Sequence, residues 1–263
     1  MSFYSRSHKN KTIGLTLSGG GMRGIAHIAV LQALEEFNLT PAVISGTSAG
    51  AIVGAFYAYG KTPSEMMEIV RNETFFSRST FRISRNGIFN PNFLLTIFSK
   101  YIPEDDFKTL KIPLYVATSE LTNGTIEYFC EGKLYEKLLA TSAVPFVFPP
   151  VIIGNKFYVD GGVLNNLPTE PIQNKCDLLI GSHVNSMGYE PVNKMSTTKE
   201  FDRILHLAIS NSVYSKKENC DIFINPPDML KYSIFKKDGL ENMFQEVYQF
   251  TCEKLNAFKE EKH

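Results

Sequence analysis

Two consecutive segments of the chain carry the same series of features: a short apolar run, a turn containing glycine, and a helix with regularly spaced apolar residues. The first leads from Ile13–Leu17 through a glycine cluster into a predicted helix that ends near Phe37. The second leads from Ala42–Ser45 through a glycine-flanked turn into a predicted helix over Ala49–Tyr59. Two strand-turn-helix units in succession predict a parallel sheet covered by helices.

The rest of the chain extends this pattern without an internal repeat or a visible linker. Residues from about 61 to 111 predict short amphipathic helices and no strong strand, so we expect them to cover the sheet. We therefore expect a single domain over residues 1–263, with a three-layer α/β/α fold and a mostly parallel central sheet. Further predicted elements are helices at Pro63–Thr74, Pro91–Tyr101, Lys133–Thr141, Thr198–Val213 and Leu240–Phe258, strands at Leu114–Ser119, Thr125–Cys130, Leu178–Val184 and Asp221–Ile224, and a hairpin at Val151–Asp160.

Composition narrows the class of partner and the compartment. The 27 basic and 27 acidic residues cancel, which argues against binding to nucleic acid through charge. The four cysteines have no metal-ligand spacing, so we expect no metal and no cofactor. The polar N-terminus and the short, proline-containing apolar run over Ala143–Ile153 predict neither a secretory signal nor a transmembrane segment. The expected location is the cytoplasm.

The first glycine turn, Gly19, Gly20, Gly21, Met22, Arg23 and Gly24, is a candidate anion-binding loop because it opens a helix. A dinucleotide site would need an acidic residue at the end of the next strand, but none follows Glu36 before Glu65. A nucleotide phosphate loop would need Lys followed by Ser or Thr, where this chain has Ile25 and Ala26. The remaining interpretations are a loop that stabilises an oxyanion and a tight turn without a chemical role.

The second glycine turn favours the oxyanion interpretation. Gly46, Thr47, Ser48, Ala49 and Gly50 match G-x-S-x-G at a junction of strand and helix. In such a nucleophile elbow the glycines let the strand and helix pass closely, while the serine projects outward at the start of the helix. Ser48 is therefore the predicted nucleophile, with Gly46 and Gly50 shaping the elbow.

A serine nucleophile needs a base, and the sequence offers an aspartate and a histidine. Asp160, followed by two glycines at a predicted strand end, can reach the carboxyl edge of a neighbouring strand, although Asp-Gly also forms simple turns. Among the histidines, His183 follows a buried strand and is the main candidate for a Ser-Asp-His triad. The other histidines are weaker candidates because of their positions: His8, His27, His206 and His263.

The motifs together resemble those of bacterial patatin-like phospholipases. The similarity covers roughly residues 12–185 and includes four blocks in order: Gly19–Gly24, the turn around Ser48, Ala140–Pro145, and Asp160–Gly162 with Asn165–Pro168 after it. This resemblance implies a patatin-like, lysophospholipase-like fold and a Ser-Asp dyad that works without histidine. Ser48 would attack the ester carbonyl, Asp160 would act as the base, the glycine loop would form the oxyanion hole, and Arg23 would brace that loop.

The implied substrate is an ester of a phospholipid or a related lipid, and transient contact with a membrane surface fits such a substrate. An apolar path to Ser48 could be lined by Phe89, Phe93, Leu94, Leu95, Ile97 and Phe98, and by Phe146, Val147 and Phe148, although core packing explains these residues equally well. The resemblance fades in the C-terminal extension from about residue 186 to 263. A lipid-binding or regulatory protein that no longer turns over substrate is the alternative function.

Overall fold

The computed structural model describes residues 11–73, 81–84, 87–89, 92–186 and 212–261 without 235, together with isolated residues between 188 and 209. Three of the histidines considered above, His8, His206 and His263, lie outside the described residues. Most of the helix predicted over Thr198–Val213 lies outside them as well.

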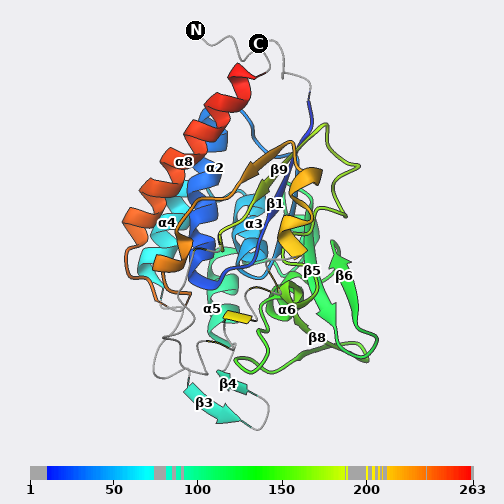
Figure 1. Ribbon diagram of the computed structural model, residues 1–263. Coiled ribbons are helices and arrows are strands. Elements are labelled where there is room, and N and C mark those ends of the chain that lie inside the picture. The colour runs from blue at the N-terminus through cyan, green and yellow to red at the C-terminus, as the bar shows by residue number, and fades with distance from the viewer. Residues whose placement is uncertain are drawn as a thin grey trace.

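The described residues form an eight-stranded sheet with the strand order β10-β9-β1-β2-β5-β8-β7, and β6 pairs with β5 (Figure 1). Strands β10, β9, β1, β2 and β5 run parallel to one another, while β6, β8 and β7 are joined by antiparallel pairings. This is the mostly parallel α/β sheet that the sequence predicts. The strands are β1 Ile13–Leu17, β2 Val43–Thr47, β5 Leu114–Glu120, β6 Thr125–Phe129, β7 Val151–Ile153, β8 Lys156–Asp160, β9 Leu178–Ser182 and β10 Ile222–Ile224.

The main helices gather around this sheet. Helices α2, α4 and α8 lie side by side in Figure 1, while α3 packs on β2, and α6 packs on β5 and β8. Their bounds are α2 Ala26–Glu36, α3 Ala49–Tyr59, α4 Pro63–Asn72, α5 Asn92–Tyr101, α6 Leu134–Thr141 and α8 Leu240–Glu260. Short 3-10 helices are η1 Gly21–Ile25, η3 Phe107–Thr109, η4 Gly161–Val163, η6 Lys217–Asn219 and η7 Met229–Lys231.

The two faces of the sheet are covered differently. Ile44 of β2 belongs to the main core that the helices share, whereas its neighbour Val43 faces a smaller cluster with Ile172 and Leu179. This alternation follows from the period of two in a strand. Burial of a large apolar side chain stabilises the fold by roughly 1.5–3 kcal/mol, so the larger core fixes the strand ends that carry the site.

The segment from about 61 to 111 differs in part from its prediction. It contains the predicted helices α4 and α5, but it also contains strands β3, Phe81–Ser84, and β4, Gly87–Phe89, which pair antiparallel in a separate two-stranded sheet. The sequence-based prediction contained no strong strand here and did not include this short hairpin. The overlooked signal is the alternation of apolar and polar residues in Phe81–Ser84 together with Asn86-Gly87, a dipeptide typical of hairpin turns.

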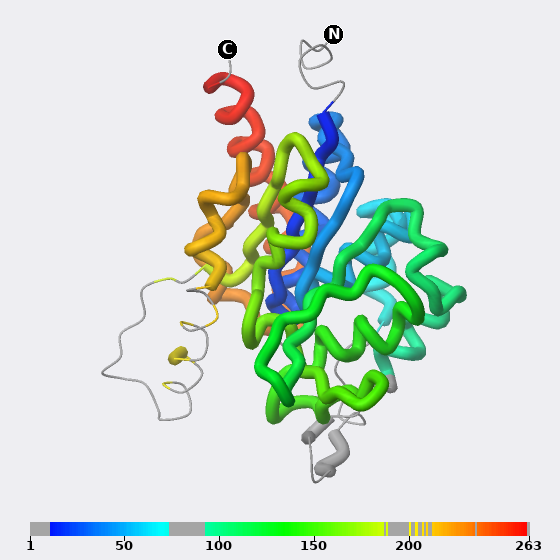
Figure 2. Tube along the Cα trace, turned by 90° about the vertical axis from the view of Figure 1, so that its right-hand side faces the viewer, coloured from blue at the N-terminus to red at the C-terminus, as the bar shows by residue number. Residues whose placement is uncertain are grey.

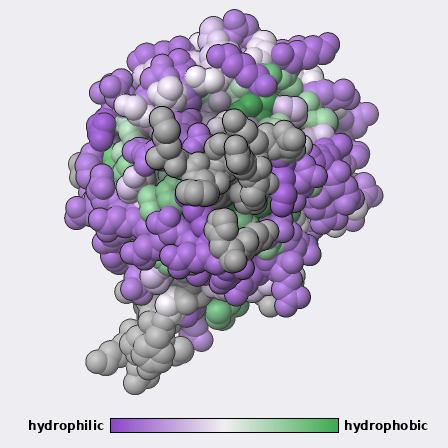
Figure 3. All heavy atoms as spheres, turned by 90° about the horizontal axis from the view of Figure 1, so that it is seen from above, coloured by the Kyte–Doolittle hydropathy of each residue, from purple (hydrophilic) through white to green (hydrophobic). Residues whose placement is uncertain are grey.

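The start of β1 and the C-terminal end of α8 lie at one end of the molecule (Figure 2). Figure 3 views this end from above, and the surface of its described residues is mostly hydrophilic. Strand β1 starts at this end, so the carboxyl ends of the parallel strands point to the opposite end. In the described part of the chain, no helix combines the length and apolarity that crossing a bilayer requires.

Candidate active site

Ser48 lies at the sharp junction between β2 and α3. Its backbone has φ 52° and ψ −124°, a sparsely populated conformation for a residue with a side chain. A Cβ added at Gly46 would lie 2.6 Å from the backbone nitrogen of Ala51, and one added at Gly50 would lie 2.5 Å from the carbonyl oxygen of Leu17. Both glycines are therefore required by close backbone approach, as expected for a nucleophile elbow.

Thr141 at the end of α6 holds this turn in place. The backbone N–H of Ser48 donates to Thr141 Oγ1 at 2.8 Å, and the Thr141 hydroxyl donates to the Ala117 carbonyl of β5 at 2.5 Å. Thr141 is completely buried, so water cannot replace either bond. Thr141 falls within the Ala140–Pro145 block of the family resemblance, but the sequence did not indicate this role.

If Ser48 is the nucleophile that the sequence predicts, Thr141→Val should lower kcat for ester hydrolysis by about 10–100-fold, because a small displacement of a nucleophile is costly in rate. The same change leaves the Ser48 N–H without its acceptor and should destabilise the fold by about 1–3 kcal/mol. Kinetics at a temperature where the variant stays folded, combined with urea unfolding, test both effects. Thr141→Ser keeps the hydroxyl and is the matched control; equal activity of the valine and serine variants would contradict the positioning role.

Asp160 lies at the end of β8 and reaches Ser48. An interaction with the Ser48 side chain acts to lower the pKa of the Asp160 carboxyl, and Asp160 Oδ1 accepts the N–H of Gly162 at 2.7 Å. The backbone N–H of Asp160 donates to the carbonyl of Ala143 at 3.0 Å. Ser48 and Asp160 are each only 7% exposed, so their side chains are shielded from bulk water.

The environment strengthens Asp160 as a base. Burial raises the pKa of Asp160 to about 6, while the hydrogen bonds from Ser48 and Gly162 oppose this shift. Desolvation penalises the carboxylate, and donated hydrogen bonds favour it. The result is a carboxyl group that is ionised at neutral pH but binds a proton more tightly than an ordinary aspartate.

The glycine loop after β1 uses several of its N–H groups for its own structure. The N–H of Gly19 donates to Asn166 Oδ1 at 3.1 Å, that of Met22 donates to the Ile234 carbonyl at 2.9 Å, and that of Arg23 donates to the Gly20 carbonyl at 3.1 Å. Within the described residues, no acceptor is found for the N–H groups of Gly20 and Gly21. The hydrogen bonds of the described loop therefore leave the N–H groups of Gly20 and Gly21 unused.

Arg23 connects the glycine loop to residues near the C-terminal part of the chain. Its Nε donates to the Tyr232 carbonyl at 2.8 Å, and its Nη1 donates to Asn185 Oδ1 at 3.2 Å. The Asn185 amide in turn donates to the Gly19 carbonyl at 2.6 Å. Asn185, Tyr232 and Ile234 therefore contact the glycine loop, although all three follow the last family motif in the sequence.

The two described histidines are held away from the dyad. His27 Nε2 lies 2.8 Å from the Ser18 carbonyl, so this nitrogen carries the proton, and Nδ1 accepts from the Ser182 hydroxyl at 2.8 Å. The His183 ring stacks on Phe223 with centroids 6.4 Å apart, and neither of its nitrogens is hydrogen bonded to the dyad in the described structure. Burial lowers the pKa of each of these histidines to about 4, so both are neutral at neutral pH.

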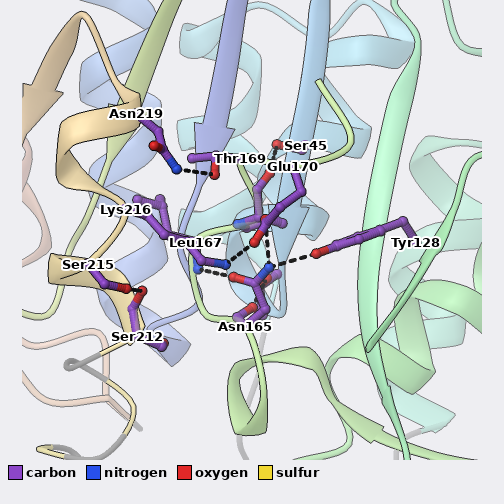
Figure 4. Close-up of polar contacts among 12 residues, drawn as sticks. Ser45, Tyr128, Asn165, Leu167, Thr169, Glu170, Ser212, Ser215, Lys216 and Asn219 are labelled. Carbon is purple, nitrogen blue, oxygen red and sulfur yellow. Dashed lines mark hydrogen bonds and ion pairs between the residues drawn. The ribbon is translucent and has the colours of Figure 1, made fainter. Parts of the chain in front are cut away.

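The loop after Asp160 is anchored to the strand that carries Ser48. Figure 4 shows the Asn165 amide between Tyr128 and Glu170, to which it donates at 2.8 and 2.9 Å, and Glu170 is paired with Lys216. The Asn165 carbonyl accepts the Thr47 hydroxyl at 2.9 Å. These bonds fix the Asp160 loop relative to the residue that immediately precedes Ser48.

An apolar pocket opens onto Ser48. The volume of this cavity is about 130 Å³. A cavity of roughly 10–15 Å³ is enough to hold one water, so the pocket has room for a much larger group. Of the residues predicted to form an apolar path, Phe93, Leu94 and Phe148 line the pocket. The full lining is Gly21, Met22, Gly24, Ile25, Ile28, Ser48, Ala49, Ile52, Val53, Phe56, Met66, Ile69, Val70, Phe93, Leu94, Ser142, Val144 and Phe148.

The other predicted path residues have different places. Ile97 and Phe98 belong to the buried core, and Phe146 is 79% exposed. Leu95 and Val147 are not among the lining residues, and the side chain of Phe89 lies outside the described part. Apolar residues of α2, α3 and α4 supply much of the pocket, which the sequence did not indicate. In the described residues, no three His, Cys, Asp or Glu side chains gather into a metal-binding group.

Comparison with known proteins shows which family the chain resembles. The model of the patatin-like phospholipase family matches residues 15–172. An uncharacterised NTE family protein of Mycobacterium tuberculosis is 30% identical over 183 residues, which are 68% of this chain and 51% of that protein. Lysophospholipase NTE1 of Cryptococcus neoformans is 31% identical over 175 residues, which are 61% of this chain and 10% of that protein. The chain thus spans about half the length of the mycobacterial relative.

Solved structures agree on the fold. The crystal structure of VipD from Legionella pneumophila has a TM-score of 0.61 at 15% identity, covering 94% of this chain and 67% of VipD. The type III effector ExoU of Pseudomonas aeruginosa has a TM-score of 0.51 at 14% identity, covering 94% of this chain and 53% of ExoU. Since the family model matches more than half of the chain and includes both Ser48 and Asp160, the chain belongs to the patatin-like phospholipase family.

Proposed function

We propose that this protein is a serine acyl hydrolase that cleaves carboxylic ester bonds of phospholipids or related lipids with a Ser48-Asp160 dyad. The observation that carries the proposal is the interaction of the Ser48 side chain with the buried Asp160 carboxyl, at the wall of an apolar pocket. Membership of the patatin-like phospholipase family and the likeness to a fungal lysophospholipase support the same substrate class.

In the first half of the reaction, Ser48 Oγ attacks the ester carbonyl carbon as Asp160 takes the hydroxyl proton. The carbonyl oxygen becomes an oxyanion, for which the N–H groups of Gly20 and Gly21 are the proposed donors. Collapse of this intermediate breaks the bond to the alcohol, and Asp160 returns its proton to that leaving group. An acyl ester of Ser48 remains.

In the second half, water attacks the acyl ester while Asp160 again accepts a proton. Collapse of the second oxyanion returns a proton to Ser48 and releases the fatty acid. The acyl chain would occupy the pocket beside Ser48, where contact with side chains such as Ile52, Phe56 and Met66 removes apolar surface from water.

A chain-length series of esters separates hydrolysis from lipid binding alone. With short- and long-chain p-nitrophenyl esters and a lysophospholipid, each varied from below to above its KM, the proposal predicts turnover, with long chains favoured in kcat/KM because they fill the pocket. A protein that only binds lipid would be stabilised thermally by fatty acid but release no alcohol. Absence of turnover for every ester tested would refute the hydrolase proposal.

The pH profile identifies the base. Asp160 must be ionised to accept a proton, and its pKa is raised to about 6, so kcat/KM should fall about tenfold per pH unit below pH 6. A base at His183, whose pKa is lowered to about 4, would place this decline near pH 4 instead. Hydrolysis of a soluble ester between pH 4 and 8, within the range where the protein stays folded, distinguishes the two bases.

A further inference from the structure

Exposed apolar side chains gather at the active-site end of the molecule. Among the described residues, ten large hydrophobic side chains are exposed, and seven of them lie between residues 121 and 164. Exposed apolar groups clustered near a functional opening mark a surface that meets a partner. Besides Val144, they are Leu121, Phe146, Ile152, Phe157, Val163 and Leu164.

One group of these side chains surrounds the dyad. The backbone bond from Asp160 to Ala143 joins two short loops, and Phe146 and Val163 each lie three residues from it, hence within about 10 Å. Val144 is 37% exposed and also lines the apolar pocket. The apolar rim is therefore continuous with the wall of the pocket that opens onto Ser48.

A second group lies on the hairpin that projects beyond the site. Thr47 at the end of β2 is level with Ala117 of β5, and β5 continues for three more residues alongside β8. Leu121 donates its N–H to the Phe157 carbonyl at 2.8 Å, and Phe157 pairs with Ile152. At about 3.3 Å per residue, these three side chains lie roughly 13 Å beyond the level of Thr47. Figure 1 shows β8 at the end of the molecule opposite the C-terminal end of α8.

Phe146 is the most exposed member of the set, at 79%. Its backbone has φ 68°, an unusual conformation for an aromatic residue. The turn thus keeps a large apolar ring in solvent at some conformational cost, although the ring lines neither the pocket nor the core. Transfer of such an exposed side chain from water into an apolar phase lowers the free energy most, because the largest apolar area is removed from water.

We infer that this rim docks on the surface of a zwitterionic lipid aggregate, with Phe146 inserted among the acyl chains, so that a lipid can enter the pocket. The inference rests on the proposed function, since it names the physical form in which the substrate is met. Residues 120–164, which contain all seven of these side chains, include three lysines, no arginine and five acidic residues, so apolar insertion, and not attraction to anionic headgroups, would drive the docking.

Cosedimentation with phosphatidylcholine vesicles tests the docking, with Ser48→Ala as the background to prevent hydrolysis. Phe146→Asn removes the ring while retaining a residue that tolerates positive φ, and should weaken vesicle partition by about tenfold. Phe146→Leu keeps an apolar side chain and should bind within about twofold of the parent. Replacing half of the lipid by phosphatidylglycerol, or adding salt, should change partition by less than about threefold.

Equal partition of the asparagine and leucine variants would overturn the docking, as would binding that requires phosphatidylglycerol. Concentration-dependent self-association without vesicle binding would also overturn it, since a second protein copy would then be the partner. With Ser48 intact, Phe146→Asn should hydrolyse a soluble short-chain ester like wild type. If wild type bound vesicles through Phe146 but cleaved no ester, the hydrolase proposal would fail while the docking surface would stand.

Discussion

Replacement of Ser48 by alanine is expected to lower ester turnover by at least about 10⁴-fold, because no other group can form the acyl intermediate. Ser48 is 7% exposed and its side chain interacts with Asp160, so the substitution removes the attacking atom and little packing. Turnover of a soluble ester by purified wild type and variant measures the effect.

Two controls make the result specific to the chemistry. Circular dichroism and thermal unfolding should show that Ser48→Ala keeps the fold, because the backbone bond from residue 48 to Thr141 does not depend on the side chain. Ser142→Ala is the matched variant, since Ser142 also lines the pocket but its hydroxyl has no hydrogen-bond partner in the described structure. Activity in the Ser48 variant comparable to that of the Ser142 variant would assign the nucleophile elsewhere.

Replacement of Asp160 by asparagine is expected to reduce kcat by about 10³–10⁴-fold and at the same time to stabilise the protein at neutral pH. The amide cannot accept the Ser48 proton, which removes general base catalysis. Asparagine has nearly the same shape, and its side-chain oxygen can still accept the N–H of Gly162, which is 2.7 Å from Asp160 Oδ1.

The stability effect follows from the raised pKa of Asp160. The pKa of Asp160 is about 6 in the folded protein and 3.8 for an ordinary aspartate. The contribution of this group to the free energy of unfolding is therefore most favourable below pH 3.8 and is lost as pH rises through 6. At pH 7 the ionised carboxyl disfavours folding by up to about 3 kcal/mol. Urea unfolding should thus show Asp160→Asn to be more stable at pH 7 and nearly equal to wild type near pH 4. An active variant, or one destabilised at pH 7, would contradict the assignment.

Much of this site was readable in the sequence because local rules impose it. A strand that turns into a helix at Ser48 needs glycines two residues on either side, and the distances at Gly46 and Gly50 give the steric reason. Asp160 was a candidate because of its place at a strand end before two glycines, and the family resemblance implied its role as the base. A Cβ added at Gly161 would lie 2.2 Å from the Ala117 carbonyl oxygen. Glycine is therefore required at this position too by the close approach of another backbone segment.

The supporting contacts were not readable because they join residues far apart in the chain. Asn185, Tyr232 and Ile234 hold the glycine loop, yet each belongs to a region without a recognisable motif. The N–H of Met22 was part of the predicted oxyanion loop, but the Ile234 carbonyl occupies it. Only the tertiary arrangement narrows the candidate donors of the loop to Gly20 and Gly21.

The pocket illustrates the same limit. Helix α4 was expected only to cover the sheet, but Met66, Ile69 and Val70 line the pocket beside Ser48. An apolar helix face has the same pattern whether it packs against the core or borders a cavity. The sequence therefore indicated an amphipathic helix without indicating that part of its apolar face remains available to a ligand.

Catalysis by the proposed dyad requires Ser48 to be an activated nucleophile. Incubation with a long-chain alkyl fluorophosphonate followed by peptide mass spectrometry tests this directly. We predict a single adduct on Ser48 that is absent from Ser48→Ala and forms much more slowly in Asp160→Asn. An unmodified Ser48 in folded wild type, or equal labelling rates with and without the Asp160 carboxylate, would contradict the account.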